Sequence, residues 1–222
     1  MKKRRIVSFI LTFVMTLSMF SGVYIPLAFA EETSGAVVGD MVYDLILHYD
    51  MRNVDGIETQ KIVRDVSGYT VNFDGILKNA EKSQVVKNDK VGFISFKGGS
   101  ASANSSYVEI PKGSDGKDVL EHVDGGVTVS TLVNWENDGD NRWIFGFGKV
   151  HEDIEYGNAY FFVTPFHGNN RTIVSGISEG GWRTETRIAG PSPLTANKWK
   201  LVTSVLNEVE QTITVYVDGV QV

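Results

Sequence analysis

Val127-Thr-Val-Ser-Thr-Leu-Val-Asn-Trp135 is the stretch of sequence that decides the fold. Every second position, from Val127 to Trp135, is β-branched or aromatic, and most of the residues between them are polar. A period of two places neighbouring side chains on opposite faces of an extended chain. The stretch therefore predicts a long β-strand with one face in a hydrophobic core.

Shorter pieces with the same pattern lie on both sides of this stretch. Strands are expected at 42–49, 91–96, 107–110, 143–147, 159–164, 171–177, 183–188, 199–206 and 212–217. Turn sequences such as Asp124-Gly125-Gly126 separate them, because glycine tolerates positive φ. The best helical candidate is one turn at 118–122. The prediction is an all-β fold, a two-sheet antiparallel sandwich of the jelly-roll type.

The last residues of the chain predict a hairpin. Thr212 to Val217 alternate in strand fashion, and Asp218-Gly219 suits a type I′ turn. Only three residues, Val220 to Val222, follow this turn. So short a second arm would expose an unpaired sheet edge. We therefore expect the domain, residues 42–222, to be C-terminally incomplete and to lack its last strands.

The first thirty residues have the layout of a secretory signal peptide. Four cations, Lys2 to Arg5, precede an apolar stretch, and Ala28-Phe29-Ala30 provides a small-x-small cleavage site. An uncleaved membrane anchor is the alternative, but polar residues interrupt the apolar run. We expect cleavage after residue 30, a short leader at 31–41, and a secreted product exported as in Gram-positive bacteria.

Composition excludes several classes of function. Removing the four leader cations from the 21 Lys and Arg leaves 17 against 27 Asp and Glu, a net charge of −10. So acidic a product does not attract nucleic acid or anionic lipid through bulk charge. The absence of cysteine excludes disulfides, thiol catalysis and thiolate metal sites.

The sequence does not advertise a catalytic centre. Sandwich glucanases carry Glu-x-Asp-x-x-Glu on one strand, and no such string occurs here. The acidic stretches 136–140 and 152–155 lie among turn residues, where nothing would desolvate a carboxylate.

Calcium accepts loop oxygens in a flexible geometry, so Asp50 and Asp65 are candidate ligands of one structural calcium ion.

Aromatic side chains are the candidate sugar contacts, because the C–H faces of sugar rings stack on aromatic rings. Trp182 follows Glu179-Gly180-Gly181 and precedes Arg183, which predicts a loop tip, and Tyr156 lies in a polar stretch. Arg142-Trp143 comes directly before an apolar strand. The predicted carbohydrate contacts are Trp182, Tyr156, Arg183, Trp143 and Arg142. Trp135 is expected to be half-buried and Trp199 to be a core residue.

Several segments, in order, resemble bacterial laminin-G-like (concanavalin-like) jelly-roll domains. The segments are Leu47–Asp50, Val63–Gly68, Tyr107–Pro111, Val127–Trp135, Arg142–Gly148, Asn158–Pro165, Asn197–Trp199 and Val215–Val220. The resemblance spans 45–222. Family members often read Phe-Asp-Phe-Gly where this chain has Phe145-Gly146-Phe147-Gly148. They also continue past the Asp-Gly hairpin with further strands.

The resemblance implies a two-sheet sandwich that accompanies catalytic domains in secreted glycoside hydrolases such as family 43. Those catalytic domains act on arabinan, xylan and related plant cell-wall polysaccharides, and the modules beside them serve as binding or spacer modules, often with a structural calcium. The expected function is a non-catalytic, lectin-like carbohydrate-binding module of an enzyme or cell-surface protein. A protein-binding or adhesive module, and a purely structural spacer, are the alternatives, and a glycoside hydrolase in its own right is the last.

Overall fold

The computed structural model describes residues 36–38, 41–43, 45–55, 61–88, 90–98, 105–137, 139–150 and 157–222. The expected signal peptide and most of the expected leader lie outside these residues. Among the described residues no helix is both long and apolar enough to cross a membrane.

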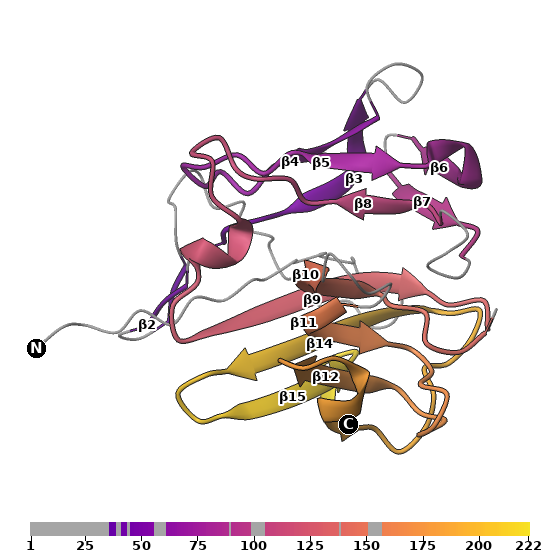
Figure 1. The fold of residues 1–222 in the computed structure, drawn as a ribbon. Helices are drawn as coiled ribbons and strands as arrows, with labels where there is room; N and C mark the ends of the chain where they lie inside the picture. The colour runs from indigo at the N-terminus through magenta and orange to yellow at the C-terminus, as the bar shows by residue number, and fades with distance from the viewer. Residues whose placement is uncertain are drawn as a thin grey trace, which may run out of the picture.

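The described residues form β-strands joined by turns and three short 3-10 helices (Figure 1). The strands of the N-terminal half are β1 (Ala36–Val38), β2 (Met41–Tyr43), β3 (Tyr49–Asp55), β4 (Ile62–Asp65), β5 (Gly75–Lys78), β6 (Ser83–Lys87), β7 (Gly92–Phe96) and β8 (Tyr107–Glu109). Those of the C-terminal half are β9 (Gly126–Asn134), β10 (Phe145–Val150), β11 (Gly157–Thr164), β12 (Val174–Ser178), β13 (Thr186–Ala189), β14 (Trp199–Asn207), β15 (Thr212–Val217) and β16 (Val220–Gln221). The 3-10 helices are η1 (Ala80–Lys82), η3 (Val119–His122) and η4 (Trp182–Thr184). The predicted all-β fold is confirmed.

Two four-stranded antiparallel sheets make up the C-terminal half, in the orders β16-β15-β14-β9 and β10-β11-β12-β13. Their facing side chains form a core that includes Val163 and Ile173 from one side and Val202 and Val215 from the other. Each fully buried valine or isoleucine contributes about 1.5–3 kcal/mol to stability. Apolar packing between the sheets therefore holds the sandwich together.

One hydrogen bond crosses this core between two hydroxyls. Ser175 of β12 and Ser204 of β14 are completely buried, and their Oγ atoms lie 2.8 Å apart. The Ser175 hydroxyl also lies 3.1 Å from the carbonyl oxygen of Phe162, to which it donates. Both polar groups are paired, which avoids the cost of burying an unsatisfied hydroxyl.

The N-terminal strands β3, β4, β5 and β8 form a third four-stranded sheet, which lies beside the sandwich in Figure 1. A second core connects the two parts, because Ile46, Leu47 and Phe73 pack with Val127 and Phe161 of the C-terminal strands. The long strand expected from the opening stretch is β9, and both Val127 and Val129 on it are buried.

The chain's last hairpin has the predicted turn. Asp218 and Gly219 have φ of 52° and 80°, the two positive values that a type I′ turn needs. The Asp218 carboxylate accepts hydrogen bonds from the Leu201 amide (3.0 Å) and the Lys200 ammonium (2.6 Å). These contacts, the lysine first, hold the pKa of Asp218 below its usual value. The turn is therefore fastened to the start of β14.

Several sequence expectations about the fold were wrong. Trp135 was expected to be half-buried, but it is only 6% exposed and belongs to the core of the sandwich. Strands β1, β4, β5 and β6 were not predicted, because they are only three to five residues long and alternate weakly. The strand expected at 42–49 is interrupted at 45–48, and β3 continues from Tyr49 to Asp55. Trp199 was expected in the core but is 40% exposed. It shares a strand face with Leu201 and Val205, as expected, but Val202 and Ser204 take the interior face of β14. Trp199 instead contacts Phe93 of β7, with ring centroids 5.5 Å apart.

Candidate functional site

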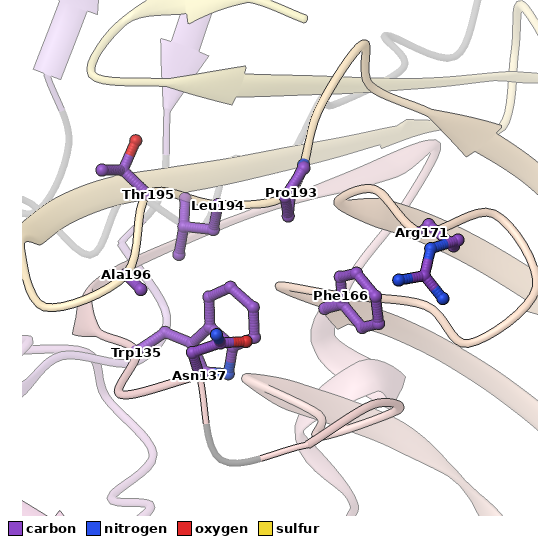
Figure 2. Close-up of a pocket in the computed structure, with 8 residues that line it drawn as sticks. All are labelled: Trp135, Asn137, Phe166, Arg171, Pro193, Leu194, Thr195 and Ala196. Atoms are coloured by element: carbon purple, nitrogen blue, oxygen red, sulfur yellow. The ribbon is translucent and has the colours of Figure 1, made fainter.

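An open pocket of about 490 Å³ lies where three loops of the sandwich meet (Figure 2). The lining residues are Trp135, Asn137, Phe166, Arg171, Pro193, Leu194, Thr195 and Ala196. None of the predicted sugar contacts lines this pocket. Trp143 lies on the outer face of the β10-β11-β12-β13 sheet, and Trp182 and Arg183 follow the end of β12 in that sheet.

Strand register determines which side chains reach that outer face. Phe162 pairs with Gly146 on one side and with Gly176 on the other, and Gly176 pairs with Arg187. In the next row, Tyr160 lies between Gly148 and Ser178. Gly146 and Gly176 leave space beside the Phe162 ring, and the side chains of Trp143 and Arg187 occupy that space.

Trp143 covers these rings and forms with them what we call the aromatic platform (Trp143, Tyr160 and Phe162). The Trp143 indole stacks on Phe162 with centroids 4.8 Å apart and planes within 17°, and its centroid is 5.2 Å from that of Tyr160. Phe162 and Tyr160 are buried beneath it, while Trp143 itself is 47% exposed. A Cβ atom at Gly146 would lie 2.8 Å from Cζ3 of Trp143, and closer still to Cε3. The platform therefore requires glycine at position 146.

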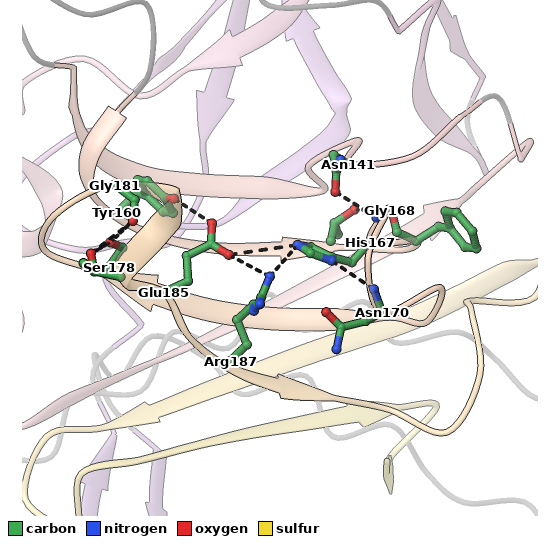
Figure 3. A network of polar contacts seen from close by, with 12 residues as sticks. Asn141, Tyr160, His167, Gly168, Asn170, Ser178, Gly181, Glu185 and Arg187 are labelled. Atoms are coloured by element: carbon green, nitrogen blue, oxygen red, sulfur yellow. Dashed lines mark hydrogen bonds and ion pairs between the residues drawn. The ribbon is translucent and has the colours of Figure 1, made fainter.

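A polar network lies next to the platform (Figure 3). The Tyr160 hydroxyl donates to Oε1 of Glu185 at 2.6 Å, and the Arg187 guanidinium lies 3.2 Å from Oε2. Burial, together with the Glu185 carboxylate, raises the pKa of the Tyr160 hydroxyl. The hydroxyl thus stays protonated and serves as a donor.

His167 joins this network as a neutral acceptor. Arg187 Nη1 lies 3.0 Å from Nε2 of His167, and arginine can only donate, so Nε2 must accept. Burial lowers the pKa of His167, and the Arg187 charge lowers it further, against the opposing effect of Glu185 and Asp140. The imidazole is therefore neutral at neutral pH.

Trp182 and Arg183 lie at the end of this face, on η4. Gly181 has a φ of 82°, which turns the chain into η4. The Ser178 hydroxyl donates to the Gly181 carbonyl at 2.6 Å and so fastens this turn to the strand beside Tyr160. Trp182 is 59% exposed, and the Arg183 guanidinium lies 5.0 Å from its ring centroid.

The structure thus places three of the five predicted sugar contacts, Trp143, Trp182 and Arg183, on or at the end of the sheet face that carries Tyr160. Arg142 is half-buried with its Nε enclosed, and a Cβ at Gly139 would lie 3.2 Å from its guanidinium. Tyr156 falls outside the described residues. Sequence reasoning did not select Tyr160, His167, Glu185 and Arg187. Strand alternation alone could have placed Tyr160 with Phe162 on one face.

Asp50 and Asp65, the predicted calcium ligands, have protein partners. Both carboxylate oxygens of Asp50 accept hydrogen bonds from Arg52, which lowers the pKa of Asp50. Asp65 accepts the backbone amides of His48, Ser67 and Phe73. Among the described residues, no three His, Asp or Glu side chains converge as metal ligands. A calcium ion would have to displace these bonds, and calcium binding stays a prediction.

Comparison with known proteins gives one family. No curated protein and no solved structure matches the chain. The model of the concanavalin A-like lectin/glucanases superfamily matches residues 102–222, which include both sheets of the sandwich and the whole outer face described above. The chain therefore belongs to the concanavalin A-like lectin/glucanase superfamily.

Proposed function

We propose that this domain is a non-catalytic carbohydrate-binding module whose contact surface is the aromatic platform with Trp182 and Arg183. The observation that supports it is the arrangement of Trp143. One face of its indole rests on Phe162, and almost half of the side chain remains exposed. Its position is set before any ligand arrives, so little conformational freedom is lost on binding.

Such a surface suits a neutral sugar polymer. The C–H patches of a sugar ring stack on an exposed aromatic face, and its hydroxyls need donors and acceptors nearby. Trp182 provides a second exposed ring on η4, which follows the strand that pairs with Tyr160, and Arg183 and Arg187 provide donors. Aromatic contacts of about 0.5–1.5 kcal/mol each support affinities in the micromolar range or weaker.

The proposal gives Glu185 a structural role and no catalytic one. Both of its oxygens already have partners, one the Tyr160 hydroxyl and the other the Arg187 guanidinium. Glycoside hydrolysis uses two carboxylates about 5–10 Å apart across the scissile bond, one of which must exchange a proton. Glu185 would have to break its contacts to take either role.

The setting we propose for this module is extracellular. The signal-like N-terminus supports export, and the superfamily supports a glycan or a protein as the partner. We expect the domain to accompany a secreted enzyme that degrades plant cell-wall polysaccharide, with arabinan or xylan as the polymer bound. A structural calcium ion remains part of this proposal, without assigned ligands.

Affinity electrophoresis tests the proposal. The purified protein is run through gels containing arabinan, xylan or β-glucan, each with calcium and with a chelator. We expect one polymer to retard the protein, and Trp143→Ala to weaken its affinity for that polymer about fivefold. Trp199→Ala is the matched control, because Trp199 is similarly exposed but belongs to the other sheet.

Two results would overturn the proposal. Retardation that Trp143→Ala leaves unchanged would show that the platform is not the contact surface. Failure of every polymer to retard a folded protein would favour the protein-binding or spacer alternatives.

A further inference from the structure

The pocket of Figure 2 is separate from the aromatic platform, although one loop contributes both to the pocket and to the polar network beside the platform. In the connection between β11 and β12, His167 belongs to the polar network of the outer face. Its neighbour Phe166 and the nearby Arg171 line the pocket instead. A ligand in the pocket would therefore lie close to, but outside, the proposed sugar-binding surface.

The pocket is already formed in the unliganded protein. The Asn197 amide donates to the Trp135 carbonyl at 2.7 Å, and the Leu194 amide donates to the Pro165 carbonyl at 3.0 Å. Trp135 and Phe166 stack within 16° of parallel, with centroids 6.0 Å apart. Three chain segments are thus fixed to one another around the cavity, whose volume is in the range of small-molecule sites.

Arg171 gives the pocket its charge. It is the one charged residue among the eight that line the cavity, in a protein whose net charge is negative. The guanidinium lies 5.4 Å from the Phe166 ring centroid, and the structure gives it no carboxylate partner among the described residues. The backbone of Arg171 has a φ of 59°, which costs a side chain other than glycine about 1 kcal/mol. Strain retained at an exposed cation points to a function for that cation.

A second polar group in the pocket wall has no partner. Trp135 is only 6% exposed, and its buried Nε1 atom has no hydrogen-bond acceptor among the described residues. Buried donors of this kind are rare, and each one needs an explanation. Trp135 and the exposed Asn137 both line the pocket, so a ligand oxygen there can serve as the missing acceptor.

We propose that this pocket binds a sugar residue that carries a carboxylate, that is, a hexuronic acid. The carboxylate pairs with the Arg171 guanidinium, which has the geometry for two parallel hydrogen bonds. The apolar side of the ring lies against Leu194 and Ala196, and the hydroxyls meet Asn137 and Thr195. The proposal goes beyond the platform and does not depend on it.

The test follows the four tryptophan indole N–H resonances of the purified protein, assigned by single Trp→Phe variants. Glucuronate, glucose and acetate are titrated separately. We expect glucuronate to shift the Trp135 resonance saturably, and glucose and acetate at equal concentration to leave it in place. Gels containing polygalacturonate show whether the same residue is recognised within a polymer.

Matched arginine variants locate the charge contact. Arg171→Gln should weaken glucuronate binding roughly tenfold, the effect of losing one charge-assisted pair. Arg183→Gln should leave glucuronate binding unchanged, because Arg183 does not line the pocket. Arg183 is the matched control because it also lies over an aromatic ring, that of Trp182. Should Arg171→Gln not fold, Arg171→Asn suits the left-handed backbone and replaces it.

The proposal is overturned if glucuronate leaves the Trp135 resonance unchanged, if acetate or glucose shifts it equally, or if Arg171→Gln binds as before. Trp143→Ala separates this proposal from the previous one. It removes the platform and should leave the glucuronate shift intact.

Discussion

Gly146→Ala is the substitution that tests the aromatic platform most directly. The added methyl carbon would lie 2.8 Å from Cζ3 of Trp143, against about 3.5–4 Å for an ordinary carbon–carbon contact. Because Gly146 is on the strand beneath the indole, the ring must move outward by about 1 Å and leave Phe162. One methyl group thus dismantles the platform while every aromatic residue remains present.

The expected change in stability has opposite signs in two backgrounds. Losing the stack and overpacking the site cost about 2 kcal/mol, whereas alanine in place of a strand glycine gains about 0.5–1 kcal/mol. In the natural protein, Gly146→Ala should therefore lower the free energy of unfolding by about 1 kcal/mol. In a Trp143→Ala background no ring opposes the methyl group, and the same substitution should raise it by about 0.5–1 kcal/mol.

Urea denaturation of the four proteins in this cycle measures the coupling, and affinity electrophoresis of the same four measures its effect on binding. Polysaccharide affinity should fall about fivefold in either single variant, and no further in the double variant. If Gly146→Ala destabilises the Trp143→Ala protein as much as it does the natural one, contact with the indole is not the reason that position 146 is glycine.

Three further predictions concern the groups that support this face. Tyr160→Phe leaves the Glu185 carboxylate without its 2.6 Å donor and should lower the free energy of unfolding in urea by about 2 kcal/mol. An unchanged urea midpoint would exclude a structural role for the network. Because the pKa of His167 is lowered in the folded protein, the unfolded chain takes up this proton first, near pH 6.5, as the pH falls. The stability that the neutral imidazole contributes should be complete above that pH and be lost as the pH falls through the folded-state pKa. Burial lowers the pKa of His48 as well, so His167→Gln should remove only its own share of the stability loss between pH 7 and 5, measured by denaturation at each pH. Ser204→Ala leaves the Ser175 hydroxyl without its core partner and should lower the free energy of unfolding by about 1–2 kcal/mol. The double variant Ser175→Ala with Ser204→Ala should lose less stability than the two single variants added together. Strict additivity in thermal unfolding would show that the two hydroxyls do not interact.

Much of the fold followed from patterns along the chain. The alternation from Val127 to Trp135 predicted β9, and Asp218-Gly219 predicted a turn with two positive φ values. The wrong prediction for Trp199 shows the limit of this reasoning. Alternation identifies which residues share a face, but which of the two faces is interior depends on the partner sheet.

The candidate site was predictable only where a single residue carries its own signal. Trp182 follows a glycine-rich turn and is exposed, as the sequence suggested. The network of Tyr160, Glu185 and Arg187 depends instead on which strands are neighbours. Tyr160 and Glu185 are 25 positions apart, and β12 lies between their segments. Pairing of this kind is set by tertiary structure and leaves no local pattern in the sequence.

Gly146 shows how a departure from a family pattern becomes interpretable once the register is known. Where the resemblance leads one to expect an aspartate, the glycine lies directly beneath the Trp143 ring. Any side chain at position 146 would occupy the space of the indole, so a carboxylate there and a flat tryptophan on Phe162 exclude each other. The missing aspartate and the exposed Trp143 are therefore one feature of this chain. That feature places an aromatic group on the outer face of the sheet where the resemblance leads one to expect a charged one, as the proposed surface for neutral sugar rings requires.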